Sequence, residues 1–115
     1  MSPSARPLTI GLVAGEVSGD QLGGALIQAL RERLPQACFV GLTGEHMRAA
    51  GCESLGSCEE LAVMGLVEPL RHLPRLLRLR ARLRREFLAR RIDVFVGVDA
   101  PAFNLGLARW LKSRG

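Results

Sequence analysis

The fold follows from one stretch of sequence: Leu8-Thr9-Ile10-Gly11-Leu12-Val13-Ala14-Gly15-Glu16-Val17-Ser18-Gly19-Asp20. Its first half is a short apolar run with β-branched residues, which is typical of a strand buried on both faces. Its second half places Gly15 and Gly19 around polar residues, and an amphipathic helical pattern follows from Gln21. A buried strand, a glycine turn and a helix form the first unit of an open α/β sheet, in which ligands bind at the carboxyl ends of the strands. We therefore expect a binding crevice near residues 15–20.

Size and composition predict one domain. The chain has 115 residues, of which 48% are hydrophobic and 23% charged, enough for a real core. No apolar run approaches the ~18 residues of a membrane-spanning helix. The polar residues 1–7 lack the apolar segment of a signal peptide, so we expect a cytoplasmic protein. The three cysteines and two histidines do not have the spacing of metal ligands. No metal site is expected, and the cysteines are interpreted as small, reduced core or loop residues.

The rest of the chain alternates strand and helix patterns. Strands are predicted at 8–14, 37–42, 53–55 and 92–98, and helices at 20–34, 45–50 and 103–113. This alternation predicts an α/β fold with a parallel sheet and right-handed crossovers. A four-strand parallel sheet that stopped at residue 115 would expose an edge, so we expect the chain to be part of something larger.

Details of three segments depend on local signals. Asp20 is interpreted as the N-cap of the first helix. The apolar face of that helix is predicted to comprise Leu22, Leu26, Ile27, Leu30 and Leu34. Residues 60–65 have little periodicity and are interpreted as a loop leading into a helix. Residues 66–91 are predicted to be a kinked segment, or a short helix followed by a longer one that starts near Pro74.

Basic residues are concentrated in one segment. Nine of the sixteen lie between Arg71 and Arg91, all are arginine, and only Glu86 opposes them there. This asymmetry indicates an anionic partner. The segment can be a solvated helix face whose arginine stems cover leucines, or an amphipathic element at an anionic membrane surface. Nucleic-acid binding is the weakest interpretation, because a chain with no tyrosine, four phenylalanines and one tryptophan has few stacking platforms.

Two sequence features are candidate site elements. The glycine turn has neither the GxGxxG spacing nor the Gly-Lys-Ser/Thr ending of phosphate-binding loops. Its glycines can still admit a ligand to N–H groups at a helix N-terminus, or can serve only to shape a tight turn. Asp99 follows the last predicted strand and can act as a general base, a helix cap or a turn residue. We favour the base, because Asp99 is slightly far from the helix predicted at 103–113.

Three pieces of the chain resemble the N-terminal part of bacterial lipid-A-disaccharide synthases, in the same order and spacing: residues 14–20 (AGEVSGD), 60–68 (ELAVMGLVE) and 93–101 (DVFVGVDAP). The resemblance covers residues 7–115. It implies the N-terminal, Rossmann-like half of a two-domain GT-B fold, with the active site between the domains and no metal or other cofactor.

The activity implied by this resemblance is glycosyl transfer to a lipid sugar in lipid A biosynthesis. UDP-2,3-diacylglucosamine is the implied donor and 2,3-diacylglucosamine 1-phosphate the acceptor. The products are a β-1,6-linked disaccharide 1-phosphate and UDP. Such enzymes are peripheral proteins at the cytoplasmic face of the inner membrane of Gram-negative bacteria.

The resemblance also implies roles for individual residues. Asp99 matches the general base, which takes the proton from the acceptor's 6-hydroxyl in an inverting transfer. Substrate contacts are implied at Gly15, Glu16, Ser18, Gly19, Asp20, Met64 and Asn104. Membrane, acyl-chain or phosphate contacts are implied at Leu73, Arg75, Leu76, Leu77, Arg78 and Arg82.

The chain departs from the family pattern in two residues and in length. Ala102 stands where the family usually has aspartate, which removes a carboxylate near Asp99, and Glu45 stands where it often has proline. The UDP-sugar site of such enzymes is mostly in the C-terminal domain, so we expect these 115 residues alone to be inactive.

Two other functions compete with glycosyl transfer. One is a basic α/β module that binds anionic membrane or nucleic acid without catalysis. The other is a nucleotide-dependent oxidoreductase, which rests on fold analogy alone. The missing GxGxxG motif and the lack of a ribose-binding acid after the second strand argue against it.

Overall fold

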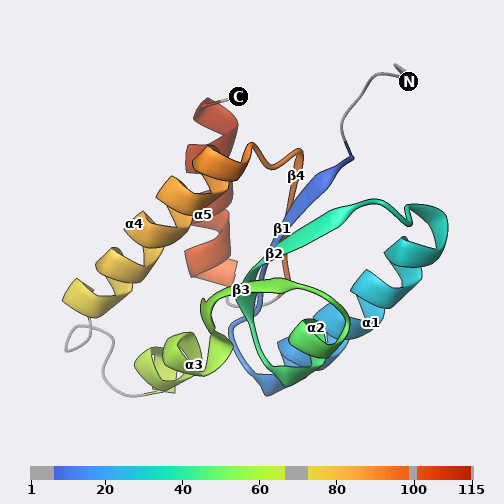
Figure 1. The fold of residues 1–115 in the computed structure, drawn as a ribbon. Helices are drawn as coiled ribbons and strands as arrows, with labels where there is room; N and C mark the ends of the chain where they lie inside the picture. The colour runs from blue at the N-terminus through green and yellow to red at the C-terminus, as the bar shows by residue number, and fades with distance from the viewer. Residues whose placement is uncertain (1–6, 67–72, 99–100, 115) are drawn as a thin grey trace.

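A computed structural model describes residues 7–66, 73–98 and 101–114 and shows one sheet with helices on both faces (Figure 1). The elements in chain order are β1 (Thr9–Val13), α1 (Val17–Arg33), β2 (Cys38–Thr43), α2 (Glu45–Ala49), β3 (Glu53–Ser57), α3 (Cys58–Leu66), α4 (Leu73–Arg90), β4 (Val94–Gly97) and α5 (Pro101–Ser113). The sheet has four strands in the order β3-β2-β1-β4, and every pair is parallel. The predicted Rossmann-like α/β fold is therefore confirmed, with the first strand at its centre.

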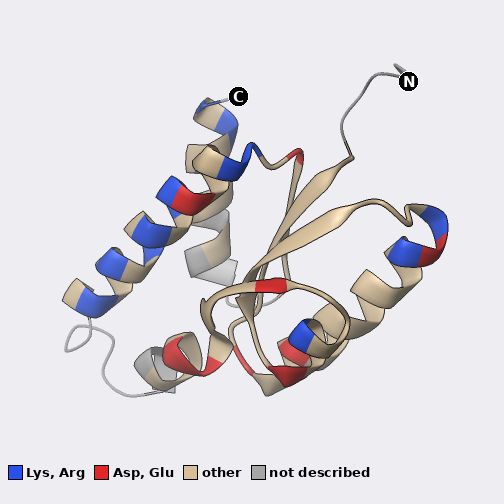
Figure 2. Cartoon of the chain, viewed as in Figure 1, with Lys and Arg blue, Asp and Glu red and all other residues tan. Residues whose placement is uncertain are grey.

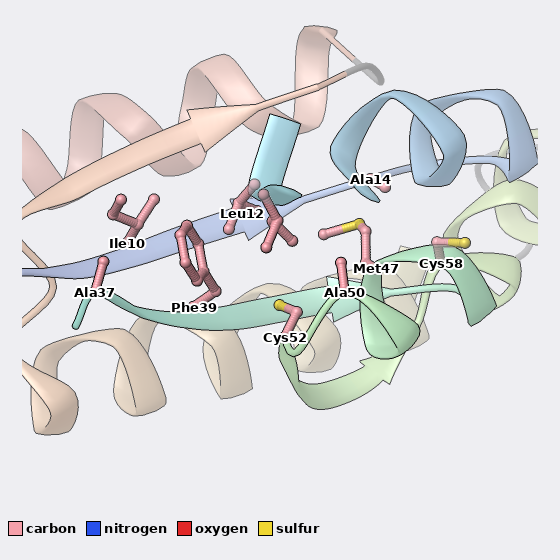
Figure 3. Packing of buried hydrophobic residues seen from close by; sticks show 10 residues of the cluster. Ile10, Leu12, Ala14, Ala37, Phe39, Met47, Ala50, Cys52 and Cys58 are labelled. Carbon is pink, nitrogen blue, oxygen red and sulfur yellow. The ribbon is translucent and has the colours of Figure 1, made fainter. Parts of the chain in front are cut away.

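The sheet separates two hydrophobic clusters. Ile10 and Leu12 of β1 join the cluster beneath α1 and α2, which also contains Phe39 and Met47 (Figure 3). Val13, also on β1, joins the opposite cluster, which α4 and α5 supply with Leu79, Leu83, Phe87 and Leu107. Because successive side chains of a strand point to opposite faces, β1 contributes to both clusters. This double burial explains why its sequence is a continuous apolar run.

The buried face of α1 differs from the predicted leucine face. Ile27 is fully buried and Leu26 and Leu30 pack against the core, as predicted, but Leu22 is 64% exposed and Leu34 is also exposed. The buried strip instead includes Gly23 and Gly24. A Cβ atom at Gly23 would lie 2.8 Å from Met47 Sδ, and one at Gly24 would lie 3.0 Å from the backbone oxygen of His46. The close approach of α2 therefore decides which face of α1 is buried.

Three predictions about element boundaries were wrong. The helix predicted at 103–113 begins at Pro101, so its distance from Asp99 no longer argues against a capping role for that residue. The helix α1 begins at Val17 with Glu16 at the N-cap, so Asp20 lies inside the helix and does not cap it. Residues 60–65, predicted as a loop, belong to α3, where Leu61 is buried in the α4 and α5 cluster. That tertiary contact compensates for the weak periodicity of the segment.

The arginine-rich segment forms the long helix that was predicted to start near Pro74. The helix α4 begins one residue before Pro74. A proline is tolerated in the first helical turn, where its missing N–H would have no intrahelical partner. The alternative with a longer helix starting near Pro74 is thus confirmed for residues 73–90, whereas residues 67–72 lie outside the described part of the chain.

Candidate functional site

The carboxyl ends of β1, β2 and β4 meet at one edge of the sheet. The register pairs Val13 with Leu42 on one side and with Gly97 on the other. Just beyond these pairs, Ala14 N donates to Leu42 O at 3.2 Å, and Val98 N donates to Val13 O at 3.0 Å. The strand order reverses between β1 and β4, and ligands of open α/β sheets bind at the carboxyl side of such a reversal. We therefore assign the candidate site to this edge.

The glycine turn leads from β1 into α1 at this edge. Glu16 has extended backbone, with φ −162° and ψ 175°, and its side chain does not cap the helix. The side chains of Glu16 and Ser18 are exposed, and Ser18 Oγ donates to Glu16 Oε1 at 3.4 Å. Gly15 and Gly19 are buried beside them. The turn thus presents two polar side chains next to the positive end of a 17-residue helix.

Asp20 connects the glycine turn to the next loop along the edge. Its side chain is buried, and its Oδ1 accepts hydrogen bonds from Gly44 N and Met47 N, both at 2.9 Å. Its Oδ2 accepts one from His46 N at 2.8 Å and lies 3.1 Å from His46 Nδ1. The carboxylate therefore caps the N-terminus of α2. Substrate contact by Asp20 stays a prediction, while these bonds give it a structural role.

The same contacts set the charge of Asp20. Burial raises the pKa of this carboxyl, but the three backbone N–H groups and the His46 side chain outweigh burial and leave the pKa below its ordinary value. A charged capping carboxylate is favoured because the N–H groups at a helix start carry partial positive charge. Asp20 is accordingly ionised at neutral pH.

The residue facing Asp20 across this contact is Gly44. A Cβ atom at Gly44 would lie 2.5 Å from Asp20 Cγ and 2.6 Å from Oδ2. Its φ of −109° is one that any residue adopts, so the close approach alone requires glycine. No local sequence signal singles out Gly44 for this contact. The available signal was topological, since loops after two adjacent parallel strands meet at one edge.

Asn104 reaches the same edge from α5. It is buried, its Nδ2 donates to Val13 O at 3.4 Å, and its Cβ lies 2.7 Å from the position of a Cβ at Gly97. The structure therefore brings Asn104 together with the ends of β1 and β4. Asp99 and the side chains of Met64 and Ala102 lie outside the described residues, so their roles stay predictions.

The first half of α4 presents the predicted membrane or phosphate contacts. Leu73, Arg75, Leu77 and Arg78 are exposed, whereas Leu76 packs against the core. Figure 2 shows Lys and Arg positions, coloured blue, repeated along this helix. A groove of about 490 Å³ runs beside them; its lining residues are Glu60, Arg75, Arg78, Leu79, Ala81, Arg82 and Arg85. None of the helices in the described ranges is both long and apolar enough to span a membrane.

Not all arginines of α4 are available to a ligand. Arg90 pairs with Glu86 and Glu53, and the Arg84 guanidinium lies 4.8 Å from the Trp110 ring centre. Arg82 Nη2 lies 3.9 Å from Glu60 Oε1 on α3. Within the described ranges, Arg75, Arg78 and Arg85 line the groove and form no ion pair, so these three are the arginines most available to an anionic ligand.

A second cavity lies at the opposite, amino end of β4. Its volume is about 510 Å³, and its walls come from the end of α4, the start of β4 and the end of α5, including Phe87, Phe95 and Lys112. This cavity is slightly larger than the groove beside α4, but none of the glycine-turn residues lines it. The carboxyl edge, where the polar residues gather, remains the better candidate site.

The buried Cys52 carries no reactive thiolate. Cys52 and Cys58 are buried and unbridged. Burial, followed by the charge of Glu53, raises the pKa of Cys52 to about 12, so its thiol is protonated at neutral pH. The interpretation as reduced core residues is confirmed for these two, whereas Cys38 is exposed at the start of β2.

Comparisons with known proteins point to one family. The profile of the family described as Lipid-A-disaccharide synthetase (LpxB) matches residues 10–115. Lipid-A-disaccharide synthases from Xanthomonas euvesicatoria and Sodalis glossinidius are 59% and 61% identical over 111 and 112 residues. These matches cover 96% and 97% of this chain but 25% and 29% of the relatives, so the chain spans little more than a quarter of their length.

Proposed function

Because the chain belongs to the lipid-A-disaccharide synthetase family, we propose that it forms the N-terminal, acceptor-side part of a glycosyltransferase of lipid A biosynthesis. The proposed reaction transfers the sugar of UDP-2,3-diacylglucosamine to 2,3-diacylglucosamine 1-phosphate, with UDP as leaving group. The observation that carries the proposal is the family match over residues 10–115, whose glycine-turn motif, residues 14–20, lies at the carboxyl end of the central strand.

In the proposed mechanism Asp99 is the general base. It accepts the proton of the acceptor's 6-hydroxyl while that oxygen attacks the anomeric carbon and the bond to UDP breaks, which inverts the anomeric centre. In sequence Asp99 lies between Gly97, where β4 ends, and Pro101, where α5 begins. Support comes from the bond of Val98 N to Val13 O, because it keeps the residue before Asp99 beside the glycine turn.

The polar residues of the turn and of α5 are proposed to hold the substrates. Glu16 and Ser18 are exposed beside the reversal in strand order and suit sugar hydroxyls. Asn104 positions the start of α5 against the end of β1. Gly15 and Gly19 shape the turn so that a ligand approaches the backbone closely. Neither a metal nor another cofactor is needed for a single proton transfer with a good leaving group.

We further propose that the start of α4 contacts the membrane. Exposed Leu73 and Leu77 enter the lipid boundary, while Arg75 and Arg78 meet anionic headgroups or the acceptor's 1-phosphate. This arrangement would make the protein peripheral to the cytoplasmic face of the inner membrane.

Vesicle binding tests the membrane contact. Replacing both Arg75 and Arg78 with alanine is expected to lower partitioning onto phosphatidylglycerol-containing vesicles by about 10- to 30-fold, given ~1 kcal/mol per arginine near an anionic surface. Cosedimentation of the 115-residue chain measures it. The control replaces Arg33 and Arg48, which are exposed on α1 and α2, and removes the same charge. An equal loss in the control would show that net charge, rather than this face, drives binding.

Product formation tests the glycosyltransferase. A chimera is made in which residues 1–115 replace the matching segment of the Sodalis glossinidius relative, hereafter the chimera. We expect it to convert the two sugar lipids to the disaccharide 1-phosphate, whereas the 115-residue chain makes no product. Disaccharide synthesis by the chain alone would contradict the two-domain proposal. A folded, membrane-bound chimera without product would favour the binding module instead.

A further inference from the structure

We propose that Asp20 is a positioning residue of the transfer reaction, which holds the β2–α2 turn and the glycine turn in one fixed arrangement at the carboxyl edge. The catalytic part of this inference rests on the proposed function. The mechanical part rests on hydrogen bonds that join residues 24 to 27 positions apart in sequence.

The cap of α2 is not provided by its own N-cap residue. A helix start is ordinarily capped by the side chain of that residue, usually serine, threonine, aspartate or asparagine. The N-cap of α2 is Gly44, which has no side chain, and the capping oxygens come from Asp20 on α1. A helix of five residues is marginal alone, so its placement depends on this external cap. These hydrogen bonds connect the start of α2 and its preceding turn directly to α1.

Asp20 is also bonded to the glycine turn through its main chain. Its N–H donates to the backbone oxygen of Glu16 at 3.0 Å. Glu16 is one of the two exposed polar residues of the glycine turn and lies one helical turn before Asp20. On the other side, Gly44 adjoins Thr43, whose Oγ1 donates to Ser54 Oγ at 2.9 Å. A continuous series of contacts therefore runs from Glu16 through Asp20 and Gly44 to β3. Asp20 is the link that joins the first loop of the edge to the second.

The His46 ring suggests a competing role for the same carboxylate. Its Nδ1 lies 3.1 Å from Asp20 Oδ2 and its side chain is 54% exposed, as in a carboxylate–imidazole proton relay. Positioning and relay make different predictions. Three of the four contacts of the Asp20 carboxylate are hydrogen bonds from backbone N–H groups. These three bonds do not depend on the His46 side chain. Positioning thus requires Asp20 but not the imidazole.

The test compares Asp20→Asn with His46→Gln and with Glu32→Gln, which removes an exposed acid near the other end of α1. In the chimera, Asp20→Asn is expected to lower kcat/KM by about 10- to 100-fold, the size expected for lost hydrogen bonds to a charged group. His46→Gln and Glu32→Gln should stay within about 3-fold of the parent, as changes at exposed side chains do.

Amide hydrogen exchange on the 115-residue chain tests the hydrogen bonds between Asp20 and the β2–α2 turn and needs no catalytic activity. Asp20→Asn should speed exchange of the Gly44, His46 and Met47 amides by a similar factor while the β1 amides stay protected. Gly44→Ala keeps the carboxylate but forces a Cβ to within 2.5 Å of Asp20 Cγ, so it should have the same effect. Gly106→Ala is its control, since the new Cβ would meet nothing closer than Arg80 Nη1 at 3.4 Å.

Three results would overturn the proposal. The first is that the amides of the β2–α2 turn exchange at the wild-type rate in Asp20→Asn, which would show that Asp20 does not hold this turn. The second is faster exchange with unchanged kcat/KM in the chimera, which would leave Asp20 a structural cap only. The third is a loss in His46→Gln as large as that in Asp20→Asn, which would indicate a relay. If the parent chimera makes no product, that result counts against the proposed function. The exchange data then test only whether Asp20 holds the β2–α2 turn.

Discussion

Replacing Asp99 with asparagine in the chimera is expected to lower kcat by about 10²- to 10⁴-fold, the usual contribution of a positioned general base. Asparagine has nearly the same size and still accepts a hydrogen bond, but it cannot take the proton of the acceptor's 6-hydroxyl. Substrate binding should therefore change far less than kcat. Initial rates of disaccharide formation over a range of acceptor concentrations separate the two quantities.

The control for Asp99→Asn is Glu59→Gln, which removes an exposed carboxylate of α3. It should leave both kcat and vesicle binding unchanged. If Asp99→Asn kept its rate within about 3-fold of the parent, general-base catalysis by Asp99 would be excluded, because the loss would fall far below the range for such a group.

Phe87→Ala is expected to lower the free energy of unfolding of the chain by about 3–5 kcal/mol, the usual cost of emptying a large buried aromatic site. Phe87 is fully buried at 0% exposure in the cluster beneath α4 and α5. Its ring packs edge-on against that of Phe95, with ring centroids 5.9 Å apart. The ring also lies over Gly11, where an added Cβ would be only 3.1 Å from Phe87 Cε1. Urea unfolding followed by circular dichroism measures the loss.

The neighbouring residue provides a matched control. Leu88 is 45% exposed on the same helix, so Leu88→Ala should change the unfolding free energy by less than about 1 kcal/mol. Equal losses in the two variants would contradict the packing of α4 against the sheet. A domain stability of about 5–15 kcal/mol means that Phe87→Ala alone removes a large share of it.

Local patterns predicted most of the fold. The strands at 8–14, 37–42, 53–55 and 92–98 are confirmed within a few residues. The buried strands β1 and β2 are marked by short apolar runs between turn residues. The segments that failed have weak local signals. In α3 periodicity is poor, and the helix depends on a contact of Leu61 with the core.

The candidate site was predicted in part. The glycine turn was expected to line a crevice, and the structure does place Glu16, Ser18 and Asn104 at the edge where β1 and β4 end. The start of α4 is exposed, and its contact with membrane or phosphate stays a prediction. The contact of Asp20 with Gly44 was missed, because it joins residues 24 positions apart and Asp20 has a satisfactory local explanation as a helix cap.

The sequence by itself determined the positions of the four strands, the double burial of β1 and the family to which residues 10–115 belong. Those features depend on hydrophobic period, turn residues and motif order, all of which are local. The tertiary structure alone decided that α1 buries Gly23 and Gly24 while Leu22 is exposed, and that Asp20 caps a different helix. The physical reason is that close helix contacts and capping bonds between residues 27 positions apart arise only once β1 and β2 lie side by side.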